Sequence, residues 1–156
     1  MDSLSINYLL ENLKNPDAIV REQATRRIWR LWFQQKGIYG LEKIDYSQQL
    51  IDVGKVATAE EVLTSLIEAQ PDFAETWNRR AFLYYRIGNY QKSLADCQMV
   101  VQLNPLHLGA LHGIGLCWAV LGQYAEAIQA FQKALVIQLY SLVNPKLILE
   151  YRLKLS

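Results

Sequence analysis

The side chains best suited to metal or covalent chemistry are few in this sequence and poorly spaced for it. His107 and His112 are five residues apart, and no carboxylate or cysteine completes a metal-binding set with them. Cys97 and Cys117 are the only cysteines, so they define neither a disulfide framework nor a paired zinc motif. We expect both thiols to pack as small buried side chains, with a redox role as the alternative.

Motifs that carry catalysis are also missing from the sequence. There is no glycine-rich phosphate loop, no nucleophile elbow and no HExxH zinc motif. We therefore predict a protein that is not an enzyme and that uses no cofactor and no metal. Recognition chemistry is better represented, because Phe82 and Tyr85 lie close to Arg79 and Arg86 in the sequence. Aromatic rings and guanidinium groups often anchor a bound protein or peptide.

Composition and charge limit the classes of protein and of partner. The chain has 156 residues, of which 51% are hydrophobic and 20% charged, as in a single globular domain. Sixteen Lys and Arg against fifteen Asp and Glu give a net charge of +1, without the basic excess typical of nucleic-acid binding. No apolar run reaches the roughly 18 residues of a membrane span, and the acidic start is unlike a signal peptide. We expect no nucleic-acid partner, no transmembrane segment and a cytoplasmic location.

Landmark residues recur at an interval of 34 along most of the chain. They are glycines, prolines, small residues or bulky residues: Gly54, Gly88 and Gly122; Pro71 and Pro105; Ala59, Ser93 and Ala127; Leu50, Tyr84 and Trp118. Within one period, an apolar helical face through Trp77, Ala81 and Tyr84 ends at Gly88, and a second helix follows. Each period therefore predicts two antiparallel helices that approach closely at small residues.

This pattern resembles the tetratricopeptide repeat, a helix–turn–helix unit of 34 residues. In the unit 74–107 the landmark positions of the repeat hold Trp77, Ala81, Tyr84, Gly88, Tyr90, Ser93 and Pro105. The resemblance implies an all-α, right-handed solenoid of antiparallel helix pairs, with about nine helices in one domain. Its expected parts are an N-terminal helical cap made of a degenerate repeat (1–39), three repeats (40–73, 74–107 and 108–141) and a C-terminal capping helix (142–156).

The first helix of each pair is expected to line the concave face of such a solenoid. Ten side chains are expected to form a partner-binding groove there: Asn78, Arg79, Phe82, Tyr85, Arg86, Gln48, Asp45, Asp52, His112 and Leu116. Ile44 and Ile51 are expected to point into the same groove. The chain is thus predicted to be a non-catalytic adaptor or scaffold that captures a peptide or helix of a protein partner.

Charged residues of this groove have an alternative role. Asp45 and Arg79 occupy equivalent positions one repeat apart, as do Asp52 and Arg86. Two ion pairs between neighbouring repeats, each worth at most about 1 kcal/mol if exposed, are therefore the alternative to ligand binding.

The chaperone-binding members of the family suggest a more specific comparison. They hold the C-terminal tail of a chaperone with a clamp of Lys, Asn and Arg side chains on three successive first helices. At the matching positions this sequence has Ile44 and Gln48, then Arg79, then Gly109 and Gly113. The clamp is not reproduced, so we expect a chaperone tail to be a disfavoured partner.

Arg80 is unusual because it stands where the repeat normally has leucine. It lies on the side of its helix that faces the paired helix, which carries Asp96. We expect an Arg80–Asp96 pair, with joint binding of an anion by Arg79 and Arg80 as the alternative.

The terminal helices supply two further surfaces. The predicted helix 17–36, opened by Asn15–Pro16, carries Arg26, Arg27 and Arg30. These arginines form either the solvated face of a packing helix or a contact to a membrane or nucleic acid.

In the C-terminal helix, Leu147, Tyr151 and Leu155 form an apolar stripe that is expected to pack on the last repeat. Leu149 and Leu153 begin a second stripe, available for a dimer contact. The alternative function is accordingly a structural or assembly subunit that associates through its terminal helices, as a monomer or weak homodimer, with a self-satisfied groove.

Overall fold

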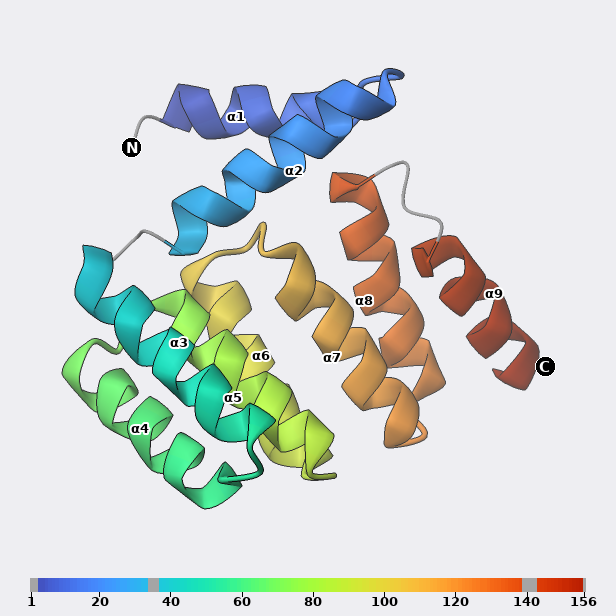
Figure 1. Ribbon diagram of the computed structural model, residues 1–156. Helices are drawn as coiled ribbons and strands as arrows, with labels where there is room; N and C mark the ends of the chain where they lie inside the picture. The colour runs from blue at the N-terminus through green and yellow to red at the C-terminus, as the bar shows by residue number, and fades with distance from the viewer. Residues whose placement is uncertain (1–2, 34–36, 139–142, 156) are drawn as a thin grey trace.

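The computed structural model describes residues 3–33, 37–138 and 143–155, and within these ranges every regular element is a helix (Figure 1). In chain order the helices are α1 (Ser3–Asn12), α2 (Ala18–Phe33), α3 (Gly37–Asp52), α4 (Val56–Ala69), α5 (Ala74–Arg86), α6 (Tyr90–Leu103), α7 (Leu108–Val120), α8 (Tyr124–Ile137) and α9 (Val143–Leu155). No helix in these ranges is long and apolar enough to cross a membrane.

Helices α3 to α8 form three antiparallel pairs stacked side by side, with α3 and α4 at one end and α9 beyond α8 at the other (Figure 1). Each first helix contacts its own second helix, and each second helix contacts the first helix of the next pair. This arrangement confirms the predicted all-α solenoid.

The turn inside each pair is the same structure repeated three times. Gly54, Gly88 and Gly122 have φ angles of 82°, 82° and 81°, in the left-handed region that favours glycine. The residue after each glycine donates its backbone N–H to a carbonyl in the last turn of the first helix: Lys55 to Leu50, Asn89 to Tyr84 and Gln123 to Trp118, each at 2.8 Å. These are the bonds of a Schellman helix end, so the 34-residue interval of glycines fixes where every first helix stops.

Small residues lie where the paired helices touch, as predicted. The Ser93 hydroxyl of α6 donates to the Ala81 carbonyl of α5 at 2.7 Å. In the next pair, a Cβ on Gly115 of α7 would meet the Phe131 ring of α8, with Cδ1 only 2.7 Å away. Larger side chains at these points would separate the helices.

Arg80 forms the predicted pair with Asp96 and ties three helices together. Its Nε and its terminal nitrogen donate to the two carboxylate oxygens of Asp96 at 2.7 and 2.9 Å, and another nitrogen donates to Thr64 of α4 at 3.1 Å. The hydrogen bond with Asp96 raises the pKa of Arg80. The guanidinium also lies over the rings of Trp77 and Tyr84, at 5.2 and 5.6 Å from their centroids. With all these partners, Arg80 is a packing residue rather than part of an anion site.

The N-terminal pair lies across an edge of the solenoid rather than beside α3 (Figure 1). The buried cluster of this pair consists of Leu9, Leu13, Ala24 and Ile28. Leu108 at the start of α7 and Ile137 at the end of α8 pack against it, and α2 also contacts α5. This placement differs from the predicted stacking on the first repeat at the N-terminal end. The apolar face of α1 and α2 is covered by the ends of α7 and α8, which form the last helix pair.

The start of α2 also differs from the prediction. The sequence favours a start at Asn15–Pro16, whereas α2 begins at Ala18 and its first turn is capped by Asp17. The Asp17 carboxylate accepts the backbone N–H of Ile19 at 2.9 Å, which satisfies one otherwise unpaired donor of the first turn. Arg26, Arg27 and Arg30 are exposed on this helix, and Arg26 pairs with Glu22 one turn earlier.

Helix α9 packs on the last pair through part of the predicted stripe. Leu147 and Tyr151 lie against the core of α7 and α8, and the Tyr151 ring stacks on Tyr124 at 5.4 Å between centroids. Leu155 belongs to the predicted stripe, but it is exposed. Leu149 and Leu153 are exposed as expected.

Candidate partner-binding groove

A pocket of about 480 Å³ opens between α5, α6 and α7. Three kinds of side chain line it: aromatic and apolar, polar or basic, and very small. They are Ala81, Phe82, Tyr85, Cys97 and Leu116; Asn78, Arg79, Ser93 and His112; and Gly109 and Gly113. We call this site the groove pocket.

Six of the ten predicted groove residues meet at the groove pocket. They are Asn78, Arg79, Phe82, Tyr85, His112 and Leu116. Gln48 reaches the site indirectly through Arg79, whereas Asp45, Asp52 and Arg86 are exposed and do not line it. Ile44 and Ile51 were expected in the groove, but both are buried in the core, since the phase of α3 turns them toward α4 and α5.

Arg79 is held in place by a neutral partner. It donates to the amide oxygen of Gln48 on α3 at 2.7 Å, and the Gln48 amide nitrogen donates to Asp52 at 2.8 Å. No ion pair among the described residues joins Asp45 to Arg79 or Asp52 to Arg86. The Nε–H of Arg79 is buried and has no hydrogen-bond partner in the described part of the chain. The predicted self-satisfaction by cross-repeat ion pairs is therefore not what the structure contains, and one buried donor of Arg79 stays without a partner.

Aromatic side chains give the pocket walls their shape. The Tyr85 ring meets Tyr90 edge-on at 5.2 Å between centroids, and burial raises the pKa of Tyr85, so its phenol stays neutral. Phe82 is nearly half exposed, and the guanidinium of Arg86 lies 5.9 Å from its ring centroid. His112 lies against the ring of Phe131 at 5.5 Å. The pocket is thus lined by ring side chains from two helices, Phe82 and Tyr85 of α5 and His112 of α7.

The floor contains residues that the sequence analysis did not assign to the groove. Cys97 of α6 is one of these residues. Its hydrogen bond with Cys117, and then its burial, raise the pKa of the Cys97 thiol. The Cys117 thiol also lies 3.4 Å from the Ser93 hydroxyl. Both thiols are free and buried. The glycine pair at 109 and 113, one helical turn apart on α7, was the signal in the sequence for a notch at this place.

His107 is a structural residue away from the groove. Its Nδ1 accepts the backbone N–H of Ala110 at 3.1 Å and caps α7, while its Nε2 hydrogen bonds with the Glu75 carboxylate. Both side chains are fully buried. Over the described residues no three His, Cys, Asp or Glu side chains cluster as a metal site would require.

Comparison with known proteins matches the repeats that build this groove. Residues 74–106 and 109–138 each match the tetratricopeptide repeat family. The chain contains tetratricopeptide repeats. A TPR repeat-containing protein of Rhizobium etli is 33% identical over 94 residues, which are 60% of this chain and 46% of that protein. The human protein SGT1 homolog is 35% identical over 86 residues, 55% of this chain and 23% of its own length. The chain thus spans less than half the length of these relatives.

Solved tetratricopeptide domains share the fold. The first domain of Spaghetti (RPAP3), bound to the HSP90 peptide SRMEEVD, has a TM-score of 0.70 at 20% identity, covering 74% of this chain and 91% of that domain. The second domain of Spaghetti, bound to the same peptide, is 27% identical with a TM-score of 0.59, covering 62% of this chain and 90% of that domain.

These neighbours overturn the prediction that a chaperone tail is a disfavoured partner. That prediction was wrong because it compared only residues at the clamp positions. The tertiary structure places a cation, Arg79, in the lining of the pocket, and the missing side chains at Gly109 and Gly113 leave space there.

Proposed function

We propose that this protein is a non-catalytic interaction adaptor that captures an acidic peptide segment of a partner in the groove pocket. The observation that carries the proposal is the buried, unpartnered Nε–H of Arg79 beside a mostly apolar pocket. A buried donor without a partner costs free energy, roughly 1–3 kcal/mol, that a ligand carboxylate recovers on binding. Similarity to peptide-binding tetratricopeptide domains supports the same role.

The two kinds of wall define the ligand. Arg79 favours a carboxylate, and Asn78 and His112 offer further polar contacts at the pocket. The rings of Phe82 and Tyr85 together with Leu116 favour an apolar side chain a few residues away. The HSP90 peptide SRMEEVD combines both features, because its Glu and Asp residues flank valine and follow methionine. We therefore propose acidic chaperone C-terminal tails as the first ligand class to test.

We also infer that residues 40–73 form a divergent repeat that precedes the two matched repeats in the chain. Its support is the turn at Gly54, which has the φ angle and the hydrogen bonds of the turns at Gly88 and Gly122. The same segment supplies Gln48, which orients Arg79 from the neighbouring pair. In this proposal the groove needs the divergent repeat for its geometry.

Fluorescence polarisation with labelled SRMEEVD tests the proposal directly. We expect saturable binding to the wild type and at least a 10-fold loss with Arg79→Ala, because one charge-assisted hydrogen bond contributes about 1.5–3 kcal/mol. Arg152→Ala removes an exposed arginine of α9 and is the matched control, for which we expect unchanged affinity. Absence of binding to the wild type rejects this ligand class, and equal affinities of the wild type and Arg79→Ala reject the site.

A second pair of variants tests the apolar wall. Leu116→Ala shortens a pocket side chain, whereas Val120→Ala shortens an exposed one on the same helix outside the pocket. We expect a several-fold loss of affinity from the first and none from the second. The alternative function, assembly through terminal helices, is not favoured by the comparisons, and it predicts that neither change matters.

A further inference from the structure

The outer face of α3 carries a row of large side chains that no described helix covers. Tyr39, Tyr46 and Val53 follow one another at intervals of seven residues along this face and are 56%, 46% and 70% exposed. One period later, Tyr39 corresponds to Phe73, which is buried against Leu66 of α4. The position of Tyr39 is therefore covered where another helix pair precedes it, whereas Ile87, the equivalent of Val53, stays 49% exposed.

Arg80 shows the same relation for Tyr46. It is the equivalent of Tyr46, and it is covered by α4, to which it donates a hydrogen bond at Thr64. No described helix covers α3 in this way, because the pair α1–α2 packs instead on Leu108 and Ile137. The part of this face around Tyr39 and Tyr46 thus matches a surface that the neighbouring repeats bury, and no described helix buries it on α3.

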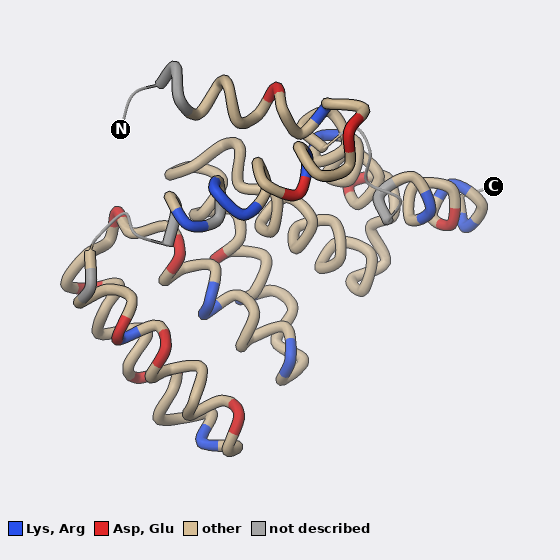
Figure 2. The backbone as a smooth tube through the Cα atoms, turned by 45° about the horizontal axis from the view of Figure 1, so that its top comes forward, with Lys and Arg blue, Asp and Glu red and all other residues tan. Residues whose placement is uncertain are grey.

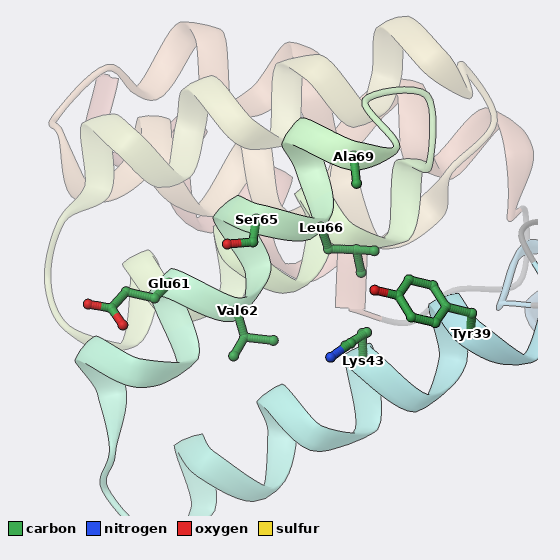
Figure 3. Close-up of a pocket in the computed structure, with 7 residues that line it drawn as sticks. All are labelled: Tyr39, Lys43, Glu61, Val62, Ser65, Leu66 and Ala69. Carbon is green, nitrogen blue, oxygen red and sulfur yellow. The ribbon is translucent and has the colours of Figure 1, made fainter.

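A cleft of about 330 Å³ lies beside this face, between α3 and α4. Figure 3 shows Tyr39 and Lys43 projecting from α3 on one side, and Val62, Leu66 and Ala69 on the α4 side. Ser65 and Ala69 leave the α4 wall low, so a helix lying on α3 could bring one apolar side chain into the cleft. Val62, Leu66 and Ala69 would contact it, and the charged side chains Lys43 and Glu61 also line the cleft.

Charge specifies what kind of helix fits. Residues 37–72 contain seven Asp and Glu against two Lys, a net charge of −5 in a chain whose total is +1. Figure 2 shows acidic residues along α3 and α4, whereas most basic residues lie on other helices, chiefly α2, α5 and α9. Glu42, Glu61 and Glu68 are exposed on this acidic end. Opposite charges across an interface favour the correct partner and speed its association, and like charges exclude others.

We propose that the acidic end formed by α3 and α4 is a second docking surface, which binds a basic amphipathic helix of a partner protein. Apolar residues of that helix at seven-residue spacing lie on Tyr39, Tyr46 and Val53, with one in the cleft beside Val62. Its Lys and Arg residues flank the apolar stripe and face the glutamates. This surface is separate from the groove pocket, so an adaptor with both sites holds two partners at once.

The probe for this site is a labelled 21-residue helical peptide of leucine and lysine in a heptad pattern, with a version carrying glutamate for lysine as its control. We expect the lysine peptide to bind in a salt-sensitive manner and the glutamate peptide to bind at least 10-fold more weakly. Tyr46→Ala combined with Val53→Ser should weaken the lysine peptide at least 10-fold. Tyr8→Ala, an exposed tyrosine on α1, and Arg79→Ala should leave its affinity unchanged.

Amide chemical-shift mapping locates the bound peptide. Shifts confined to α3 and α4 support the proposal, whereas shifts centred on the groove pocket overturn it. Equal binding of the lysine and glutamate peptides also overturns it. Light scattering tests whether a second copy of this chain occupies the surface instead. A concentration-dependent dimer that is abolished in the Tyr46→Ala/Val53→Ser variant would assign the surface to self-association and reject a partner helix.

Discussion

Helix α5 carries two adjacent arginines whose surroundings differ completely. Arg80 lies on the packing face, where Asp96 and Thr64 accept its hydrogen bonds and two aromatic rings flank it. Arg79 lies on the groove face, where Gln48 is its described partner and its Nε–H is unused. The same side chain is thus fully satisfied on one side of the helix and incompletely satisfied on the other.

This difference separates folding from recognition. A residue whose hydrogen bonds are complete stabilises the folded chain and has nothing left for a ligand. A residue oriented by a neutral partner is kept in position yet retains binding capacity, as the geometry of Arg79 indicates. Changes on the packing face should therefore lower stability, while changes on the groove face should lower affinity with little effect on stability.

The largest effect on stability is expected from Asp96→Ala. It leaves the Arg80 charge largely buried without its carboxylate, which typically costs 3–5 kcal/mol. Urea unfolding followed by circular dichroism measures the change. Replacing Arg80 and Asp96 together by leucine should recover most of the loss, since a well-packed apolar pair avoids the desolvation cost. A loss below about 1 kcal/mol for Asp96→Ala would contradict the assignment of this face to folding.

A pair of glycines on α7 gives the next comparison. Gly115→Ala places a methyl group against the buried Phe131 ring and should cost about 1–3 kcal/mol. Gly113→Ala meets only the Cys97 sulfur, at 3.0 Å, and should cost less, but its methyl group narrows the groove pocket. Thermal unfolding and SRMEEVD titration of both variants should show opposite orders: Gly115→Ala worse for stability, Gly113→Ala worse for binding.

Tyr84, on the packing face of α5, makes the unfolding free energy depend on pH in the alkaline range. Burial, and then the hydrogen bond that its hydroxyl donates to Glu60 at 2.7 Å, raise its pKa from 10.0 to about 12. The fold therefore favours the neutral phenol. This contribution is complete below the unfolded pKa near 10 and is lost as pH rises toward 12.

Tyr84→Phe should accordingly lose about 1–2 kcal/mol at neutral pH and show a shallower fall in unfolding free energy between pH 10 and 12 than the wild type. Urea unfolding across this range measures both effects. Tyr46→Phe, on an exposed tyrosine of α3, is the control and should follow the wild-type profile. Parallel profiles for all three proteins would remove Tyr84 from the packing network.

The smallest stability effect is expected from Arg79→Ala. Its one described hydrogen bond is to a neutral amide, and its removal also eliminates an unsatisfied buried donor, so the net change should stay below about 1 kcal/mol. The same urea titration used for Asp96→Ala measures it. A loss as large as that of Asp96→Ala would show that the two faces of α5 do not divide folding from binding.

The sequence alone determined the repeating part of this protein. Gly54, Gly88 and Gly122 set the helix ends, and the Arg80–Asp96 pair followed from the phase of the two helices. These features depend on backbone conformation and on residues that one short turn brings together. Local periodicity therefore predicts them well, and it also identified most of the groove pocket.

Only the tertiary structure decided what covers each remaining face. The placement of α1 and α2 on Leu108 and Ile137, the burial of Ile44 and the arrival of Cys97 at the pocket floor depend on contacts between distant segments. Several apolar faces of similar size compete for such contacts, and the hydrophobic effect is not directional, so helix periodicity does not choose among them. That choice left the groove pocket open and the acidic end of α3 and α4 uncovered.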